Sequence, residues 1–179
     1  LYSASSSKFG NDGKDEHLSP YSWSKSKNIE FIKNFSKWYN LKYEILYFYN
    51  VYGNNHIKNN KMAAVIGIFE SQFLNKKNLT VVRPGTQRRD FTHVIDIVDG
   101  LIKIAFSDKE HKDAWELGTG LNYSVNELFK MFNDKFSCKS IHLPDQKGNY
   151  KLTLRENDDL IDELGWLPKD RLKQHIDSI

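Results

Sequence analysis

Cysteine, proline and long apolar runs are scarce in this chain of 179 residues, which contains one cysteine and four prolines. The single cysteine, Cys138, cannot form an internal disulfide, which is typical of a reducing compartment, so we expect a cytoplasmic protein. No apolar run approaches the roughly 18–20 residues that cross a bilayer, and the first residues lack the pattern of a secretory signal peptide. These absences predict a soluble globular chain with no membrane partner.

A strong excess of one charge is also absent. The chain has 26 basic and 23 acidic residues, giving a net charge of +3, and its densest basic spots are the pairs Arg88-Arg89 and Lys76-Lys77. Because nucleic-acid binding needs a basic patch or stripe, no nucleic-acid partner is expected. Hydrophobic residues make up 39% of the chain, which is enough to bury the core of one domain or little more.

What the sequence does contain is an alternation of strand and helix signals. Ser19-Pro20 is typical of a helix start, and Ile29, Ile32, Phe35 and Tyr39 follow at the spacing of an amphipathic helix. Further helices are expected at 63–74, 94–105, from the capping box at 124–127 onward and at 160–164, and strands at 43–49, 79–82, 114–117 and 141–144. This alternation favours the α/β class, with parallel strands in the first half.

Tyr21 and Lys25 are the first candidates for chemistry, because residues four apart on a helix share a face. An ammonium group close to a phenol favours the phenolate and lowers a pKa that is ordinarily about 10. The pair is therefore suited to act as a general base near neutral pH. With nine tyrosines and 26 basic residues, about one such pair is expected by chance, so the spacing alone does not establish a site.

The neighbours of this pair strengthen the case. A serine-rich strand end, Ser3–Ser7, precedes the helix, and Asn50 ends the buried strand that follows it. Ligands of open α/β sheets bind at the carboxyl ends of the strands. We therefore expect a hydroxyl, the Tyr/Lys pair and Asn50 to converge on one crevice, with the run Gln87-Arg88-Arg89-Asp90-Phe91 able to place a guanidinium group on a phosphate.

Six motifs in this order carry a resemblance to a known family. They are Ser5 five residues before Gly10, Tyr21-Ser-Trp-Ser-Lys25, Phe48-Tyr49-Asn50-Val51-Tyr52-Gly53, Arg89-Asp90-Phe91-Thr-His-Val94-Ile-Asp96, Gly118-Thr119-Gly120 followed by Ser124-Val125, and Leu164-Gly165-Trp166-Leu-Pro168. Together they resemble the C-terminal portion of the NAD-dependent epimerase/dehydratase family of extended short-chain dehydrogenases/reductases, typified by UDP-glucose 4-epimerase.

The resemblance implies the C-terminal part of a doubly wound parallel Rossmann-type sheet and a smaller mixed α/β substrate-binding lobe. Residues 1–53 are expected in the NAD-binding domain and 54–179 mainly in the nucleotide-sugar lobe, with about 90–120 returning to the Rossmann sheet. No G-x-G-x-x-G motif for the NAD pyrophosphate occurs. We therefore expect a fragment that is inactive alone and binds NAD weakly, an expectation that micromolar binding in calorimetry would contradict.

The resemblance also implies roles for single residues. Tyr21 is expected to take a proton from a sugar hydroxyl, and Lys25 to hydrogen-bond the nicotinamide ribose of NAD and to lower the pKa of the tyrosine. Ser5 is expected to hold the reacting oxygen. Tyr49 is expected to bind the cofactor together with Tyr21 and Lys25.

Asn50 and Arg89 match positions that contact the nucleotide-sugar and its phosphates. Other interpretations are that Asn50 is a turn residue and Arg89 a surface ion-pair partner. The arginine common before Pro-Gly-Asp in the family is replaced here by the run Gln146-Lys147-Gly148-Asn149. His93 is expected to be structural, at a loop or helix start, and no metal site is expected.

The leading hypothesis is a nucleotide-sugar 4-epimerase, with a UDP-sugar as the expected substrate. A keto-reductase uses the same Ser/Tyr/Lys trio, whereas Ser6 and Ser7 stand where dehydratases have Asp-Glu, which argues against 4,6-dehydration. A non-catalytic binding or assembly module is the alternative of another class. A homodimer is expected, with Phe31, Phe35 and Trp38 either at the subunit contact or in the core.

Overall fold

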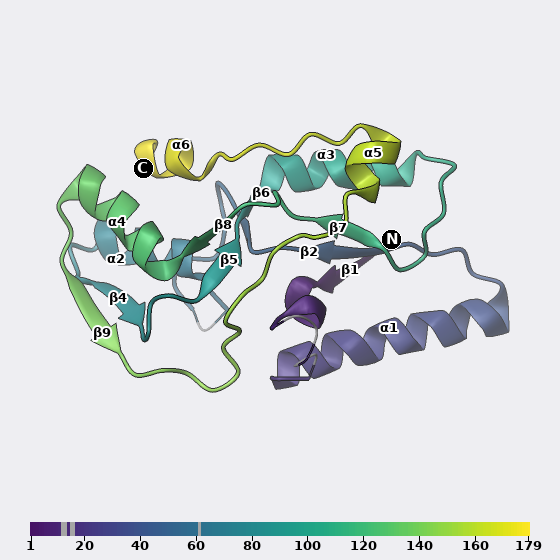
Figure 1. Cartoon of the computed structure of the whole chain (residues 1–179), viewed down its shortest axis with the longest axis horizontal. Helices are drawn as coiled ribbons and strands as arrows, with labels where there is room; N and C mark the ends of the chain where they lie inside the picture. Colours follow the sequence, from purple (N-terminus) through teal and green to yellow (C-terminus); the bar gives the residue numbers. More distant parts are fainter. Residues whose placement is uncertain (12–13, 15–16, 61) are drawn as a thin grey trace.

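The computed structural model describes residues 1–11, 14, 17–60 and 62–179 (Figure 1). Its strands are β1 (Tyr2–Ser5), β2 (Ile45–Phe48), β3 (Val51–Tyr52), β4 (Leu79–Val82), β5 (Arg88–Asp90), β6 (Thr92–His93), β7 (Trp115–Leu117), β8 (Asn122–Ser124) and β9 (Ser140–Leu143). Its helices are the 3-10 helix η1 (Ser6–Phe9) and the α-helices α1 (Pro20–Tyr39), α2 (Val65–Leu74), α3 (Val94–Ala105), α4 (Val125–Phe136), α5 (Asp159–Leu164) and α6 (Leu172–Asp177). The alternation confirms the predicted α/β class.

A parallel sheet with the strand order β1-β2-β7 forms the first half of the molecule. Helix α1 lies along one face of this sheet, and α3 and α5 lie along the other (Figure 1). Because successive side chains of a strand point to opposite faces, Ile45 and Tyr47 pack toward Ile29 of α1, whereas Leu46 packs toward Ile97 of α3. The central strand is buried on both sides, as expected of a parallel sheet covered by helices.

The second half, here called the second lobe, has its own core. Strands β4 and β9 pair in parallel, and α2, α4 and α6 pack around them. Phe69, Leu79, Leu128, Phe132 and Leu172 are buried together in this core. The short antiparallel pair β5–β8, the parallel pair β3–β6 and the last helix, α6, were not predicted from the sequence.

The helix ends follow the local sequence signals. Ser19 is the N-cap of α1 and accepts a hydrogen bond from the amide of Ser22 at 3.2 Å, and Asn40 ends the helix in the left-handed conformation. The predicted capping box of α4 is confirmed, because Ser124 and Glu127 each accept a hydrogen bond from the other's amide. Among the described residues, no helix combines the length and apolar character needed to span a membrane.

The apolar stripe predicted on α1 is buried only in part. Ile29 is buried, whereas Phe31, Phe35 and Trp38 are exposed, and the ring of Phe35 contacts those of Phe31, Trp38 and Tyr39 at 4.8–6.1 Å. The alternative that these aromatic residues fill the core is therefore wrong. The reason is that α1 packs on β1 and η1 through its opposite face. We call Phe31, Phe35, Trp38 and Tyr39 the aromatic face of α1.

A contact between distant parts of the chain fixes the start of α1. Tyr150 packs directly over Gly10, where an added Cβ atom would lie 2.0 Å from the tyrosine ring. The Tyr150 hydroxyl donates a hydrogen bond to Ser22 Oγ at 2.6 Å. The segment around residue 150 is thereby held against η1 and the first turn of α1.

Candidate active site

A pocket of about 400 Å³ lies at the carboxyl ends of β1 and β2. These two strands are parallel neighbours, so their ends meet at one edge of the sheet. The first turns of α1 close the pocket from the side. Its lining residues are Ser3, Ala4, Ser5, Ser6, Tyr21, Lys25, Phe48, Asn50 and Val51. Four predicted site residues, Ser5, Tyr21, Lys25 and Asn50, thus meet in what we call the Tyr21 pocket.

The reactive groups of this pocket are presented by short-range contacts. Tyr21 lies in the first turn of α1 and is 52% exposed, so its phenol is accessible. Lys25 lies one turn later, where its Nζ donates a hydrogen bond to the Ser3 carbonyl at 2.9 Å and lies 5.9 Å from the centre of the Tyr21 ring. Ser5 is the N-cap of η1, and its Oγ accepts a hydrogen bond from the Ser7 amide at 3.2 Å. The pocket therefore combines a phenol, an ammonium and a hydroxyl.

Asn50 connects this pocket to a second one of about 290 Å³, which we call the Arg89 pocket. Asn50 lies between β2 and β3, and its Nδ2 donates to Thr153 Oγ1 at 3.2 Å. The Arg89 pocket is lined by both polar and apolar side chains. Its lining residues are Asn50, Ala63, Ala64, Val65, Ile68, Thr80, Val82, Gln87, Arg89, Val125, Leu143, Gln146 and Asn149. Two of these, Gln146 and Asn149, belong to the run that replaces the family's arginine.

Arg89 is the cationic group of the second pocket. Its guanidinium group donates to the Arg88 carbonyl at 2.8 Å and to Asn149 Oδ1 at 2.5 Å. Burial lowers the pKa of Arg89 to about 10, so the group is still charged at neutral pH. No carboxylate of the described residues lies within ion-pair distance of it, so the alternative of a surface ion-pair partner is wrong. A half-buried guanidinium without a carboxylate partner is suited to bind an anion.

Tyr49 lies outside both pockets. It is fully buried beneath the sheet, and its hydroxyl donates a hydrogen bond to Glu116. Burial, followed by the charge of Glu116, raises the pKa of Tyr49 well above its usual value. In an extended segment neighbouring side chains point to opposite sides, so Phe48 and Asn50 line the Tyr21 pocket while Tyr49 points away. This position does not support the expected role in cofactor binding.

Two further motif residues have structural roles. His93 is the N-cap of α3, where its ring accepts a hydrogen bond from the Ile95 amide at 3.2 Å, as predicted for a helix-start residue. Asp90 is fully buried and accepts hydrogen bonds from the amides of Thr119, Gly120 and Arg155 at 2.9–3.2 Å. It therefore holds the Gly-Thr-Gly loop at the end of β7.

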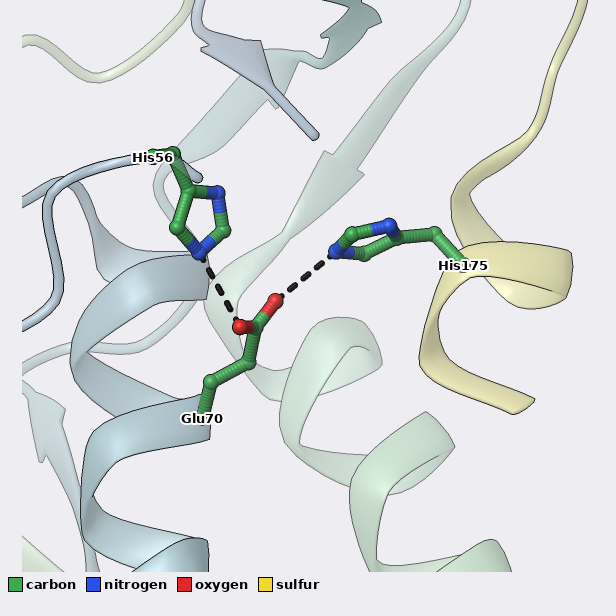
Figure 2. Close-up of side chains that lie close together, drawn as sticks. All are labelled: His56, Glu70 and His175. Carbon is green, nitrogen blue, oxygen red and sulfur yellow. Dashed lines mark hydrogen bonds and ion pairs between the residues drawn. The ribbon is translucent and has the colours of Figure 1, made fainter. Parts of the chain in front are cut away.

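One cluster was missed by the sequence interpretation, which expected no metal site. His56, Glu70 and His175 lie together in the second lobe and could hold a metal ion (Figure 2). Because 14 residues separate the first two and 105 the last two, no short motif marks the group.

The parallel sheet covered by helices, with a serine and a Tyr-x-x-x-Lys pair at its carboxyl edge, defines the class of Rossmann-type short-chain dehydrogenase/reductase proteins. The family model "NAD dependent epimerase/dehydratase family" matches residues 1–118. The chain therefore belongs to the NAD-dependent epimerase/dehydratase family.

The relatives found by sequence and structure include several with 4-epimerase names, beside UDP-glucuronic acid decarboxylases and a dTDP-glucose 4,6-dehydratase. A Methanocaldococcus jannaschii protein provisionally named UDP-glucose 4-epimerase is 32% identical over 90% of this chain and 52% of its own length. The UDP-N-acetylglucosamine 4-epimerase of Methanobrevibacter ruminantium, solved with UDP-N-acetylmuramic acid, matches with a TM-score of 0.84 and 28% identity over 98% of this chain and 59% of that one.

A more distant structure shares the fold. The UDP-glucuronic acid 4-epimerase of Bacillus cereus, solved with UDP-glucuronic acid and NAD, has a TM-score of 0.86 at 22% identity, over 97% of this chain and 57% of that one. The chain spans about half the length of the relatives that it matches.

Proposed function

We propose that the complete protein is a nucleotide-sugar 4-epimerase that uses NAD. The observation that carries this proposal is the Tyr21 pocket, in which Ser5, Tyr21 and Lys25 share one sheet edge, with Asn50 leading to the half-buried cation Arg89. The 4-epimerase names of the relatives with 32% and 28% identity support a UDP-sugar as substrate.

The two pockets divide the substrate between them. The guanidinium group of Arg89 binds the diphosphate, for which a half-buried cation without a carboxylate partner is suited. The apolar side chains of the Arg89 pocket take the base, and the sugar extends past Asn50 into the Tyr21 pocket. In this division residues 1–53 and about 90–120 carry the chemistry, and the remainder of 54–179 binds the nucleotide.

The donor set of the Tyr21 pocket fits the nicotinamide ribose end of NAD. NAD, when bound, supplies a hydride acceptor and donor. Tyr21 removes the proton from the sugar hydroxyl and later returns it. The Lys25 ammonium stabilises the phenolate and hydrogen-bonds the cofactor ribose, and the Ser5 hydroxyl binds the reacting sugar oxygen.

The same trio would also serve a keto-reductase, so the cofactor balance separates the two reactions. Epimerisation returns the hydride and consumes no NADH, whereas reduction consumes one NADH for each sugar. Ser6 and Ser7 are buried in η1 and offer no carboxyl group at the positions of the dehydratase acid and base. A non-catalytic module would turn over no UDP-sugar at all.

A Tyr21→Phe variant of the complete protein tests the proposal with UDP-sugars as substrates. We expect kcat to fall by about 10²–10⁴-fold, because the base is lost while the ring remains. Tyr39→Phe is the matched control, since Tyr39 is an exposed tyrosine at the other end of α1, and its turnover should match the wild type. Unchanged turnover in Tyr21→Phe would remove this residue from the mechanism.

We also propose that the aromatic face of α1 is the contact of a homodimer. Three of its residues, Phe31, Trp38 and Tyr39, are each more than half exposed, and their rings cluster around Phe35. A contiguous exposed aromatic patch is typical of a protein–protein contact.

A further inference from the structure

His56, Glu70 and His175 come from three separate parts of the second lobe and meet in its interior (Figure 2). His56 lies in the loop after β3, Glu70 in α2 and His175 in α6. Nε2 of His175 lies 2.8 Å from Glu70 Oε1, and Nε2 of His56 lies 3.1 Å from Glu70 Oε2. The ligand atoms all lie within 4.8 Å of one another. Two imidazoles thus face the two oxygens of one carboxylate.

The carboxylate at the centre of this cluster is buried and ionised. Glu70 is only 2% exposed, and a buried charge is unfavourable unless positive groups compensate it. Lys58 provides such a group, with its Nζ 2.7 Å from Oε2. Burial by itself raises the pKa of Glu70, but the hydrogen bonds from His175 and Lys58 outweigh it and lower this pKa to about 2.

The His56 ring is the incompletely satisfied member of the cluster. Its Nε2 is buried and has no hydrogen-bond partner among the described residues, although Glu70 Oε2 is 3.1 Å away. Nε2 of His56 is therefore close to Glu70 Oε2, but the angles between the two groups are not those of a hydrogen bond. Two ligands of one metal ion lie close together without being hydrogen-bonded, because their lone pairs point at the ion and not at each other. In tetrahedral zinc sites with bonds of about 2.0–2.1 Å, neighbouring ligand atoms lie about 3.3 Å apart.

We propose that His56, Glu70 and His175 bind a divalent transition-metal ion of the zinc type. Two imidazoles and one carboxylate are a ligand set that zinc uses, with a water molecule at the remaining position. The ion takes over the charge that Lys58 supplies, and the partly exposed Lys58 side chain moves into solvent. His56 Nδ1 accepts a 3.3 Å hydrogen bond from Gly53, so coordination through Nε2 moves the ring proton to Nδ1 and gives up this long bond.

An ion in this site would join three elements that the chain otherwise holds by side-chain contacts. It would fasten α6 and the loop residues 53–60 to α2. Val65 and Ile68 of α2 line the Arg89 pocket. Metal binding would therefore fix one wall of that pocket without touching its ligand.

Titration of the metal-stripped complete protein with Zn²⁺ tests the proposal directly. We expect calorimetry to give one ion per chain, and Tm to rise by roughly 5–10 °C when Zn²⁺ is present at about 100 times its Kd. Co²⁺ provides a second readout, since a bound ion with nitrogen and oxygen ligands absorbs visible light. Absence of both Zn²⁺ uptake and a Co²⁺ spectrum would overturn the proposal.

Variants of the cluster distinguish a metal site from an ion-pair network. Glu70→Gln and His175→Gln should each weaken Zn²⁺ binding by at least about 100-fold, and Lys58→Met, which removes the competing ammonium, should tighten it about tenfold. His142→Gln is the control, because His142 is exposed on β9 outside the cluster, and its affinity should be unchanged.

A pure ion-pair network predicts a different pattern. Lys58→Met would then lower Tm and leave Zn²⁺ binding unaffected, a result that contradicts the metal site. Because this variant keeps both imidazoles and the carboxylate, it decides the question even where Glu70→Gln does not fold.

Discussion

Helices α1 and α4 carry similar apolar spacing but use it differently. In α1, which has 20 residues, only Ser22 and Ile29 are buried. In α4, which has 12 residues, Val125, Leu128 and Phe132 are buried against the core of the second lobe. The comparison teaches that a helical apolar stripe predicts a contact without specifying whether the contact lies in the chain's own core.

The sheet half and the second lobe also differ in how much of their surface other elements of the chain cover. The second lobe closes around its own core, with α2, α4 and α6 packed on β4 and β9. The sheet half leaves the aromatic face of α1 and the Tyr21 pocket open. In the proposed function this separates stability from chemistry, because the closed lobe binds the nucleotide and the open sheet edge holds the reactive groups.

The largest expected effect contrasts two phenylalanines on these helices. Phe132→Ala should lower the free energy of unfolding by about 3–5 kcal/mol, because Phe132 is fully buried and its loss leaves a cavity. Phe31→Ala is the matched control and should change it by less than about 0.5 kcal/mol, because Phe31 is 56% exposed. Urea unfolding of both variants measures the difference, and equal losses would refute the comparison.

The second prediction compares UDP binding by variants of two neighbouring arginines, Arg88 and Arg89. Arg89→Met should weaken UDP binding to the complete protein by about 10–100-fold, because a charge-assisted contact to phosphate is lost. Arg88→Met should stay near the wild-type affinity, since Arg88 pairs with Glu127 and lines neither pocket. Calorimetry with UDP measures both, and equal affinities of the two variants would exclude Arg89 as the phosphate group.

The third prediction compares buried glutamates of the two halves. The pKa of Glu70 is about 2, below its unfolded value, so the unfolded state takes up the proton first and stability is lost between about pH 4.5 and 2. Burial instead raises the pKa of Glu116 in β7, so stability rises as the pH falls toward 4.5 from above.

Urea unfolding across this pH range measures both effects, and for Glu70 the lowering of the pKa from 4.5 to about 2 corresponds to about 3 kcal/mol. Glu70→Gln should flatten the profile below about pH 4.5 and leave the part above it in place. Glu116→Gln should do the reverse. The assignment fails if both variants change the same part of the profile.

The smallest effect on stability is expected on the aromatic face of α1. The double variant Phe31→Ser/Trp38→Ser should change the free energy of unfolding of the monomer by less than about 0.5 kcal/mol per site, because both residues are exposed in the single chain. Light scattering of the complete protein should nevertheless shift from dimer to monomer. Leu167→Ser, at an exposed apolar residue between α5 and α6, is the control and should remain dimeric, and a double variant that stays dimeric would contradict the proposed contact.

Local signals account for the parts of the fold that were predicted. Ser19-Pro20 and the Ser124–Glu127 capping box satisfy helix amides within one turn, so residues adjacent in sequence determine these helix starts. Strands β5 and β8 are three residues each and pair Arg88 with Ser124, so their pairing depends on distant contacts. Helix α6 has Arg171 at its N-cap, and the Leu172 amide donates instead to Asp170, one residue earlier, so the usual N-cap signal is missing.

The sequence predicted those parts of the candidate site that follow from the order of the strands alone. Ser5 and Asn50 meet because parallel neighbouring strands end at one edge of a sheet, a rule that needs only the strand order. The side of the chain on which Tyr49 lies depends on where the extended segment turns, which its sequence does not mark. The meeting of Glu70 with His175 depends on the docking of α6 onto α2, which only the tertiary structure contains.

The contacts of Tyr150 with Gly10 and Ser22 couple these three positions, so that a substitution at one of them constrains the residues at the other two. A larger residue at position 10 requires a smaller one at position 150, and that change leaves the Ser22 hydroxyl without its donor. The two lobes therefore cannot be recombined freely among relatives at a cut between them. A chimera that exchanges the second lobe has to carry positions 10 and 22 along with residue 150, or the helix bearing Tyr21 and Lys25 loses the contact that fixes its first turn.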